Sequence, residues 1–147
     1  EMRGLKNMKL LIDTNVVLDV LLKRDPFFQT AAEVLNLSQR NDVREYISAS
    51  AVTDLYYIAH RQLRDKAAAK NLIKRLLQVV AVAAVSEREL ISALKLDWND
   101  FEDSVQYLVA LLNEMDGLVT RNPKDYVNAE IPVWEPEQIL QTFSMDP

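Results

Sequence analysis

Short runs of apolar residues alternate with longer amphipathic segments from one end of the chain to the other. Runs rich in apolar and β-branched residues predict strands at residues 8–12, 44–50, 80–86, 117–121 and 131–134. Apolar residues at helical spacing predict helices over residues 16–22, 27–40, 51–63, 65–79, 87–95 and 99–115, and from Pro136 onward. Because strands and helices alternate, we expect the fold class α/β, a three-layer α/β/α sandwich with a mainly parallel central sheet.

One domain accounts for the whole pattern. The 147 residues contain no repeat, linker or low-complexity tract, and a chain of this length can bury a sizeable core. We expect a single domain over residues 8–147, with residues 1–7 a leader or an expression remnant. No apolar run reaches the length of a membrane-spanning helix, so we expect a cytoplasmic protein without a membrane partner.

Composition excludes several kinds of chemistry. The chain has no cysteine, so it forms neither a disulfide nor a thiolate metal site. Two glycines, Gly4 and Gly117, cannot form a phosphate-cradling glycine-rich loop. His60 is the single histidine available for a zinc site or a catalytic triad. Acidic residues are therefore the abundant material for catalysis.

Acidic residues follow the predicted strands or begin the next helix. Asp13 comes directly after the first strand and Asp54 lies in the early turns of a helix. Asp100 and Asp103 share one face at a helix start, and Asp125 follows the fourth strand. Functional sites of open α/β sheets form beyond the carboxyl ends of the strands. Carboxylates gathered there repel one another, so a divalent cation is a natural reason to gather them.

Each acid also has a simpler explanation when it is taken alone. Asp13 suits the N-cap of the following helix, and Asp54 suits a solvated helix surface. Asp100 and Asp103 suit a helix start because of the macrodipole. Turn chemistry accounts for the proline turn at residues 122–125. It is the order and spacing of the whole set that favour a shared site.

The segments that carry these acids resemble one known family. The chain resembles a PIN-domain protein of the VapC-like type in LLIDTNVVLDVLL, ISASAVTDLYYI, DFEDSVQYLVALLNEMDGLVTRNPKDY and IPVWEPEQIL, which span nearly the whole chain from Met8 onward. The most specific part is DFED followed by an apolar helix and VTRNxxDY. The resemblance implies a PIN-like fold and a metal-dependent ribonuclease that hydrolyses RNA phosphodiester bonds, the toxin of a type II toxin–antitoxin pair.

The resemblance also implies which side chains do the chemistry. Asp13 matches the first family acid, Asp54 the second, and Asp103 the third, with Asp100 a frequent companion. The implied cofactor is Mg²⁺ or Mn²⁺, held directly by Asp13 and Asp103, while Asp54 and Asp100 orient waters or hold a second ion. Glu102 is expected to point away from this group into solvent.

Two polar residues support the acids by the same resemblance, and a third is suggested by its place beside Asp13. Thr120 matches the family's hydroxyl residue, and Ser48 matches a polar position after the second strand. Asn15 suits either a hydrogen bond that orients its neighbour Asp13 or a role in the turn.

Two positions depart from the family pattern. Asp54 is one methylene shorter than the more usual glutamate, so it would reach an ion only through water. Asn122 falls where many members have a fourth acid, which weakens a second ion site. Asp125 or Asp100 offers a charge in compensation.

Local positive charge must hold an RNA substrate, because the net charge of −5 argues against broad affinity for nucleic acid. Candidate RNA-binding residues lie near helix ends or next to motif segments: Lys23, Arg24, Arg61, Arg64 and Arg121. Solvated surface is the simpler explanation for any one of them. The resemblance further implies a small antitoxin protein seated in a groove, and a homodimer to which the apolar residues of LIKRLLQVV offer surface.

Two other functions stay open. The shorter second acid and Asn122 would suit a PIN-fold module that binds RNA or a protein partner without cutting. A phosphate-handling α/β protein, such as a receiver domain or a phosphatase, would also gather acids at strand ends. The first strand is not followed by the DxD motif that the phosphatase alternative needs.

Overall fold

The computed structural model of this protein describes residues 7–144, so residues 1–6 of the predicted leader lie outside the described residues. Within this range five strands form one sheet: β1 (Met8–Ile12), β2 (Val43–Ser48), β3 (Ala81–Ala83), β4 (Gly117–Val119) and β5 (Val133–Trp134). Their order across the sheet is β3-β2-β1-β4-β5, and every neighbouring pair is parallel. The predicted parallel α/β sheet is confirmed.

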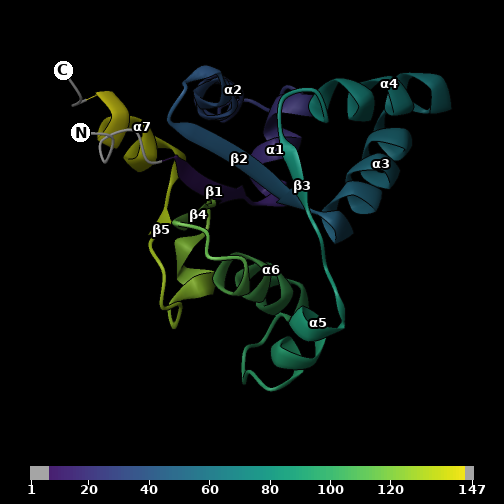
Figure 1. Ribbon diagram of the computed structural model, residues 1–147. Helices are drawn as coiled ribbons and strands as arrows, with labels where there is room; N and C mark the ends of the chain where they lie inside the picture. The colour runs from purple at the N-terminus through teal and green to yellow at the C-terminus, as the bar shows by residue number, and fades with distance from the viewer. Residues whose placement is uncertain (1–6, 145–147) are drawn as a thin grey trace.

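Helices cover both faces of the sheet (Figure 1). They are α1 (Thr14–Leu21), α2 (Phe28–Asn36), α3 (Ala49–Leu63), α4 (Lys66–Leu76), α5 (Glu87–Leu94), α6 (Phe101–Leu112) and α7 (Pro136–Ser144), with 3₁₀ turns η2 (Leu37–Gln39) and η3 (Pro123–Tyr126). Side chains of α1, α2, α3, α4 and α7 pack in one core, and those of α5 and α6 pack in the other. The predicted three-layer sandwich is therefore confirmed.

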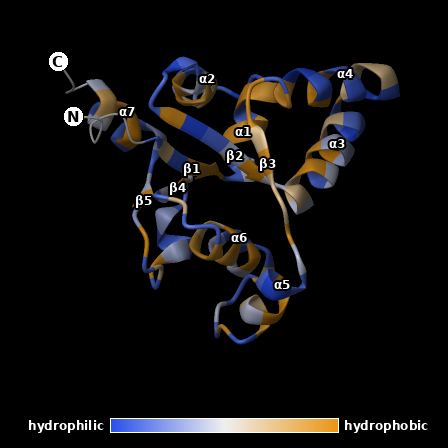
Figure 2. Ribbon diagram, viewed as in Figure 1, coloured by the Kyte–Doolittle hydropathy of each residue, from blue (hydrophilic) through white to orange (hydrophobic). Residues whose placement is uncertain are grey.

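The central strand β1 separates the two cores. Leu10 and Ile12 point to the α1–α4 side and Leu11 to the α6 side, and all three are fully buried. Such a strand must be apolar on both faces, which is why MKLLI is predicted correctly from its continuous apolar run. Figure 2 shows the hydrophobic residues concentrated on the strands and on the helix faces toward them. None of the described helices is long and apolar enough to cross a membrane.

Side-chain caps set several boundaries that the pattern of apolar residues leaves open. The predicted second strand ran to residue 50, but β2 ends at Ser48 because its hydroxyl accepts a hydrogen bond from the Ala51 N–H and begins α3. Likewise α6 begins at Phe101 instead of residue 99, because the Asp100 carboxylate accepts a hydrogen bond from the Asp103 N–H.

Gly117 allows β4 and β5 to approach closely. A Cβ atom at this position would overlap the Trp134 ring and come within 2.8 Å of the Pro132 carbonyl oxygen. Both residues precede or belong to β5, and the N–H of Leu118 bonds to that same carbonyl. This close approach allows the first residues of β4 to pair with the segment that leads into β5.

The chain order reverses between β1 and β4. From β1 the chain proceeds to β2 and β3 on one side of the sheet, and then crosses to β4 and β5 on the other. The connections that follow β1 and β4 lead to opposite faces of the sheet at such a switch point, and a crevice forms between them. Asp13 and Thr120 directly follow these two strand ends.

Candidate metal and active site

Asp13 is held by groups from three elements at the switch point. It is 8% exposed, and Thr120 Oγ1, after β4, donates a hydrogen bond to its Oδ2 at 2.7 Å. Gln106 Nε2, on α6, donates to Oδ1 at 3.0 Å. Asn15 Nδ2 lies 3.5 Å from Oδ2 and 3.4 Å from Thr120 Oγ1. The carboxylate is thus fixed in orientation by side chains distant in sequence.

This geometry argues against the explanation of Asp13 as a simple N-cap. The residue occupies the N-cap position of α1, but its side chain makes no capping hydrogen bond to that helix. The carboxylate instead faces the crevice. Burial raises the pKa of Asp13, and the hydrogen bonds from Thr120 and Gln106 oppose that effect.

The hydroxyl of Tyr126 joins Asp13 to Asp103. It lies 3.4 Å from Asp13 Oδ2 and 3.3 Å from Asp103 Oδ1. Burial raises the pKa of Tyr126 above its ordinary value, and the two carboxylates add to the effect. The phenol therefore stays protonated and donates to one carboxylate at a time. Asp13 and Asp103 consequently converge on a single point.

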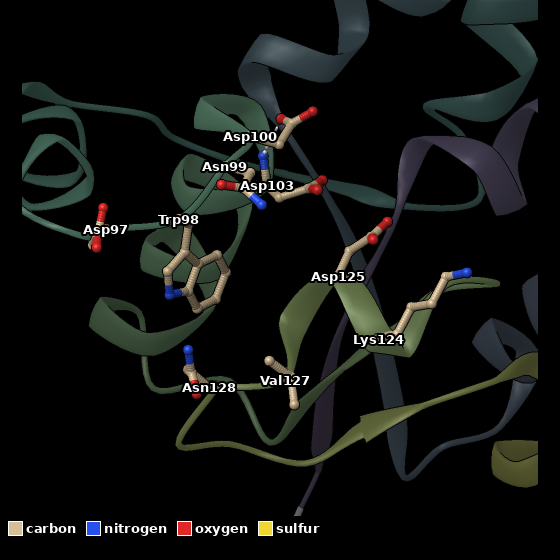
Figure 3. Close-up of a pocket in the computed structure, with 9 residues that line it drawn as sticks. All are labelled: Asp97, Trp98, Asn99, Asp100, Asp103, Lys124, Asp125, Val127 and Asn128. Carbon is tan, nitrogen blue, oxygen red and sulfur yellow. Dashed lines mark hydrogen bonds between the residues drawn. The ribbon is translucent and has the colours of Figure 1, made fainter.

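Asp103 borders the neighbouring pocket, which has a volume of about 210 Å³. Asp100, Asp103 and Asp125 project into the same region, with the indole of Trp98 at one side (Figure 3). Burial raises the pKa of Asp103 to about 6, and the charges of Asp100, Asp13 and Asp125 contribute. A nearby positive charge would stabilise the ionised form of a carboxyl group whose pKa is raised in this way. The remaining lining residues are Asp97, Asn99, Lys124, Val127 and Asn128.

Asp54 and Glu102 form a second acidic pair across α3 and α6. A hydrogen bond that the protonated Glu102 carboxyl donates to Asp54 is the main cause that raises the pKa of Glu102 to about 7, and burial adds to it. Glu102 is exposed as expected, but the prediction that it points away from the other acids is wrong. Two carboxyl groups that share a proton can share a cation instead. Glu102 is therefore an acid of this site that its sequence position alone did not reveal.

Gln106 and Lys124 are two further residues absent from the predicted set. Gln106 lies three residues after Asp103 on α6, so helical spacing places both on the face toward Asp13. Its Oε1 is buried and, among the described residues, accepts no hydrogen bond. Lys124 is the basic residue that borders the acidic pocket. Helical spacing could have found Gln106, whereas nothing local distinguishes Lys124 from other surface lysines.

Ser48 and Asn122 have structural tasks. Ser48 caps α3, and its hydroxyl also lies 3.2 Å from that of Ser50. The backbone N–H of Asn122 donates to Thr120 Oγ1 at 3.1 Å. Asn122 also lines a different pocket, together with Asp19 and Arg121. The structure thus brings Asp13, Asn15 and Thr120 together, and Asn122 joins them through its backbone N–H.

The five basic candidates do not border the acidic pocket. Arg121 Nε donates to Asp19 Oδ2 at 2.7 Å, and its guanidinium lies 4.0 Å from the Phe27 ring centre, so this arginine serves the fold. Arg24 approaches the same aspartate at 4.0 Å. Lys23 borders an apolar groove between α2 and α4.

Arg61 and Arg64 lie at the end of α3 remote from the site. Arg61 is seven residues beyond Asp54, which is about 10 Å along the helix axis. Arg64 follows as the C-cap with a φ of 55°. Both side chains are exposed, so any contact with RNA would occur away from the acids.

The donor set fits a hard divalent cation that retains much of its water. Among residues 7–144, no three acidic or histidine side chains are placed to hold an ion by themselves. Mg²⁺ and Mn²⁺ commonly take one or two carboxylates and complete their shell with water and substrate oxygen. Asp13 and Asp103, which share the Tyr126 hydroxyl, meet that requirement.

Comparisons with known proteins agree with this architecture. The PIN domain profile matches residues 9–124. No curated protein matches the chain at a significant level.

Solved structures share the fold at low identity. VapBC-1 from nontypeable Haemophilus influenzae is 19% identical, with 88% of this chain and 99% of that chain covered and a TM-score of 0.68. VapC20 of Mycobacterium tuberculosis, a sarcin-ricin loop cleaving toxin, is 17% identical over 81% and 94% of the two chains, with a TM-score of 0.64. A toxin-antitoxin complex from Klebsiella pneumoniae is 21% identical over 86% and 97%, with a TM-score of 0.63. The likeness to VapC structures and the match over most of the sequence lead to one conclusion: the chain belongs to the PIN domain family.

Proposed function

We propose that this PIN domain protein is a metal-dependent endoribonuclease that hydrolyses RNA phosphodiester bonds. The observation that carries the proposal is the convergence of Asp13 and Asp103 on the Tyr126 hydroxyl at the switch point of the sheet. The membership of the PIN domain family supports the same function. An RNA substrate would be met in the cytoplasm, where we expect the protein to act.

Asp13 and Asp103 would hold Mg²⁺ or Mn²⁺, with Asp54 and Glu102 beside them. When bound, such an ion makes water more acidic and neutralises charge on phosphate oxygens. Thr120, Gln106 and Asn15 keep the Asp13 carboxylate in one orientation, as partners of metal ligands commonly do. Lys124, at the edge of the pocket, is placed to contact a substrate phosphate.

Metal titration and RNA cleavage test the proposal together. Mn²⁺ should raise the unfolding temperature of the wild type in a saturable way and should support cleavage of a panel of ribosomal and transfer RNAs. Asp103→Asn should lose both responses, while Glu33→Gln, an exposed acid on α2, should keep both. Stabilisation by Mn²⁺ without any cleavage of the panel would contradict the nuclease function.

One observation favours a second candidate function, a PIN module that binds without cutting. Both oxygens of Asp13 already accept hydrogen bonds, and Asn122 brings no fourth charge to the group. Such a module would bind RNA equally well with and without Mn²⁺. Equal RNA affinity of wild type and Asp13→Asn, together with no cleavage, would favour it over the enzyme.

Mn²⁺ binding should weaken as the pH falls below about 6. The pKa of Asp103 is raised to about 6, so below that pH a proton occupies the carboxyl and competes with the ion. The apparent dissociation constant should therefore rise by about tenfold per pH unit below 6 and change little above pH 7. Calorimetric titration between pH 5 and pH 8 measures it. A dissociation constant that is constant over this range would exclude Asp103 as a ligand.

Glu102→Gln should lower RNA cleavage by about 10- to 100-fold, as loss of a neighbouring partner of a metal site commonly does. The amide keeps the shape but removes the charge that faces Asp54. Glu102→Asp should retain intermediate activity, and the unfolding temperature of both variants should stay near that of the wild type. Full activity of Glu102→Gln would restrict this residue to a surface role.

We also propose that the protein is a toxin whose antitoxin occupies the groove between α2 and α4. The groove has a volume of about 550 Å³, and its apolar lining includes Val20, Leu21, Phe28, Leu35, Leu72, Leu76 and Val79. An amphipathic helix would bury these side chains. Induced expression should arrest growth, and co-expression with the product of the adjacent small gene should relieve it. Normal growth of cells that contain active enzyme would contradict the toxin proposal.

A homodimer is proposed from exposed apolar side chains. Leu77, directly after α4, is 40% exposed, and on α5 Leu90, Ile91 and Leu94 are 40%, 45% and 71% exposed. Surfaces of this kind are commonly covered by a partner. Sedimentation of the purified protein measures the state, and a Leu94→Glu variant tests whether the α5 face forms the contact.

A further inference from the structure

Glu45 is a buried carboxyl remote from the acids described above. It lies in the middle of β2, beside Leu10 of β1, and is 2% exposed. Val43 and Ile47, which point to the same face of the strand, belong to the apolar core. A carboxylate in such surroundings loses its hydration and needs a partner.

Neither oxygen of Glu45 has such a partner within the described chain. Across residues 7–144, Oε1 and Oε2 are both buried and accept no hydrogen bond. The adjacent Arg44 does not serve, because successive side chains of a strand point to opposite faces. Its guanidinium instead lies 5.7 Å from the ring centre of Tyr46. A buried acid without a hydrogen-bond partner is costly, so its presence here points to a ligand.

Glu45 borders a pocket of about 490 Å³ at the amino ends of β1, β2 and β3, the sheet edge opposite the acid cluster. Four uncharged polar residues line it, Asn7, Ser38, Asn41 and Gln78, and Arg44 is a further charged residue of the lining. Helix α4 ends at Leu76, and residues 77–80 also line the pocket. The carboxyl end of a helix carries partial negative charge, which adds to the preference for a cation.

We propose that this pocket binds a cationic nitrogen group, an ammonium or a guanidinium, with Glu45 as its counter-ion. Such a group donates hydrogen bonds to both carboxylate oxygens and leaves further donors for the amide and hydroxyl oxygens around it. An anion would meet the buried acid and the helix end unfavourably. A neutral donor cannot replace the carboxyl proton and would leave Glu45 in its uncharged form.

Burial also sets how such binding depends on pH. It raises the pKa of Glu45 to about 9, so the empty pocket retains a proton at neutral pH. A bound cation replaces that proton, and binding therefore tightens as the pH rises. The other charged groups on the elements packed around Glu45 are Arg44, the Arg40–Asp42 pair, Lys74 and Arg75.

Titration with n-butylammonium chloride tests the site, with sodium chloride and n-butanol as matched charge and shape controls. The amine should raise the unfolding temperature of the wild type in a saturable way, and its affinity should increase by about tenfold per pH unit between pH 6 and pH 8. Glu45→Gln keeps the shape and should lose the response, while Glu33→Gln should keep it. In ¹³C NMR spectra, the Glu45 carboxyl resonance should move to its ionised position on saturation.

Capped lysine and capped arginine amides distinguish the source of the cation. Binding at least tenfold tighter than that of n-butylammonium assigns the pocket to a basic side chain of a polypeptide, whereas equal binding assigns it to a small amine. An amine response that persists in Glu45→Gln, or a Glu45 resonance that stays at its protonated position, would overturn the inference. Because the NMR readout uses the wild type, a folding defect in the variant would not obscure the result, which is also independent of the nuclease proposal.

Discussion

Asp13→Asn should reduce RNA cleavage by more than about 100-fold, beyond the loss expected for a partner of a metal ligand. The carboxylate lies where the carboxyl ends of β1 and β4 diverge, and it shares the Tyr126 hydroxyl with Asp103. The amide removes one negative charge from the position that would hold the ion. Initial rates with saturating Mn²⁺ on the best RNA of the panel measure the loss.

The fold should tolerate this substitution, so that the loss can be attributed to chemistry. Burial already favours the uncharged form of Asp13, and the new amide is close to it in shape. Gln106 can turn its own amide over, since its Oε1 has no partner among the described residues and can accept from the new N–H. A matching unfolding temperature is the control. Activity within tenfold of the wild type would exclude Asp13 as a metal ligand.

Asp19→Ala should lower the free energy of unfolding by about 3–5 kcal/mol, the usual effect of breaking a buried ion pair from one side. The Asp19 side chain is 1% exposed, and Arg121 Nε lies 2.7 Å from its Oδ2. Without Asp19, the guanidinium of Arg121 stays three-quarters buried and unneutralised. Urea unfolding monitored by circular dichroism measures the change.

Asp25→Ala is the matched control, because Asp25 is an exposed aspartate on the connection that follows α1. It should change the free energy of unfolding by less than about 0.5 kcal/mol. A loss below about 1 kcal/mol for Asp19→Ala would mean that the Arg121 guanidinium finds water or another partner. The Asp19 variant should also cleave RNA more slowly, since the Arg121 backbone N–H donates to Asn15 Oδ1 beside the acids.

Local signals were enough to predict the sheet and the principal acids. The apolar run of residues 8–12 predicts a central strand because it is buried on both faces. Asp13 follows it directly, and the parallel order predicted from alternating elements brings the end of β4 to the same edge. Caps such as Ser48 shift the boundaries by one or two residues, since a hydroxyl and a backbone N–H decide the first turn.

The pairing of charges could not be predicted in the same way. Arg121 was expected to bind RNA, yet its partner Asp19 is an unremarkable helix acid until α1 and β4 are packed together. Glu102 meets Asp54 only because α3 and α6 converge at the same edge of the sheet. Glu45 lies between Val43 and Ile47 on the inward face of β2, and nothing local distinguishes this buried acid from one at the edge of the core. These contacts depend on tertiary packing.

The hydroxyl of Tyr126, placed between two carboxylates, has a consequence for how the protein is made. It carries one proton that can pass between hydrogen bonds to Asp13 and Asp103, so their repulsion is moderated without any dication. Newly synthesised chains can therefore complete folding before they encounter a metal. If the proposed ion binds here, loading would be a late, reversible step, and chelation would silence the protein without unfolding it.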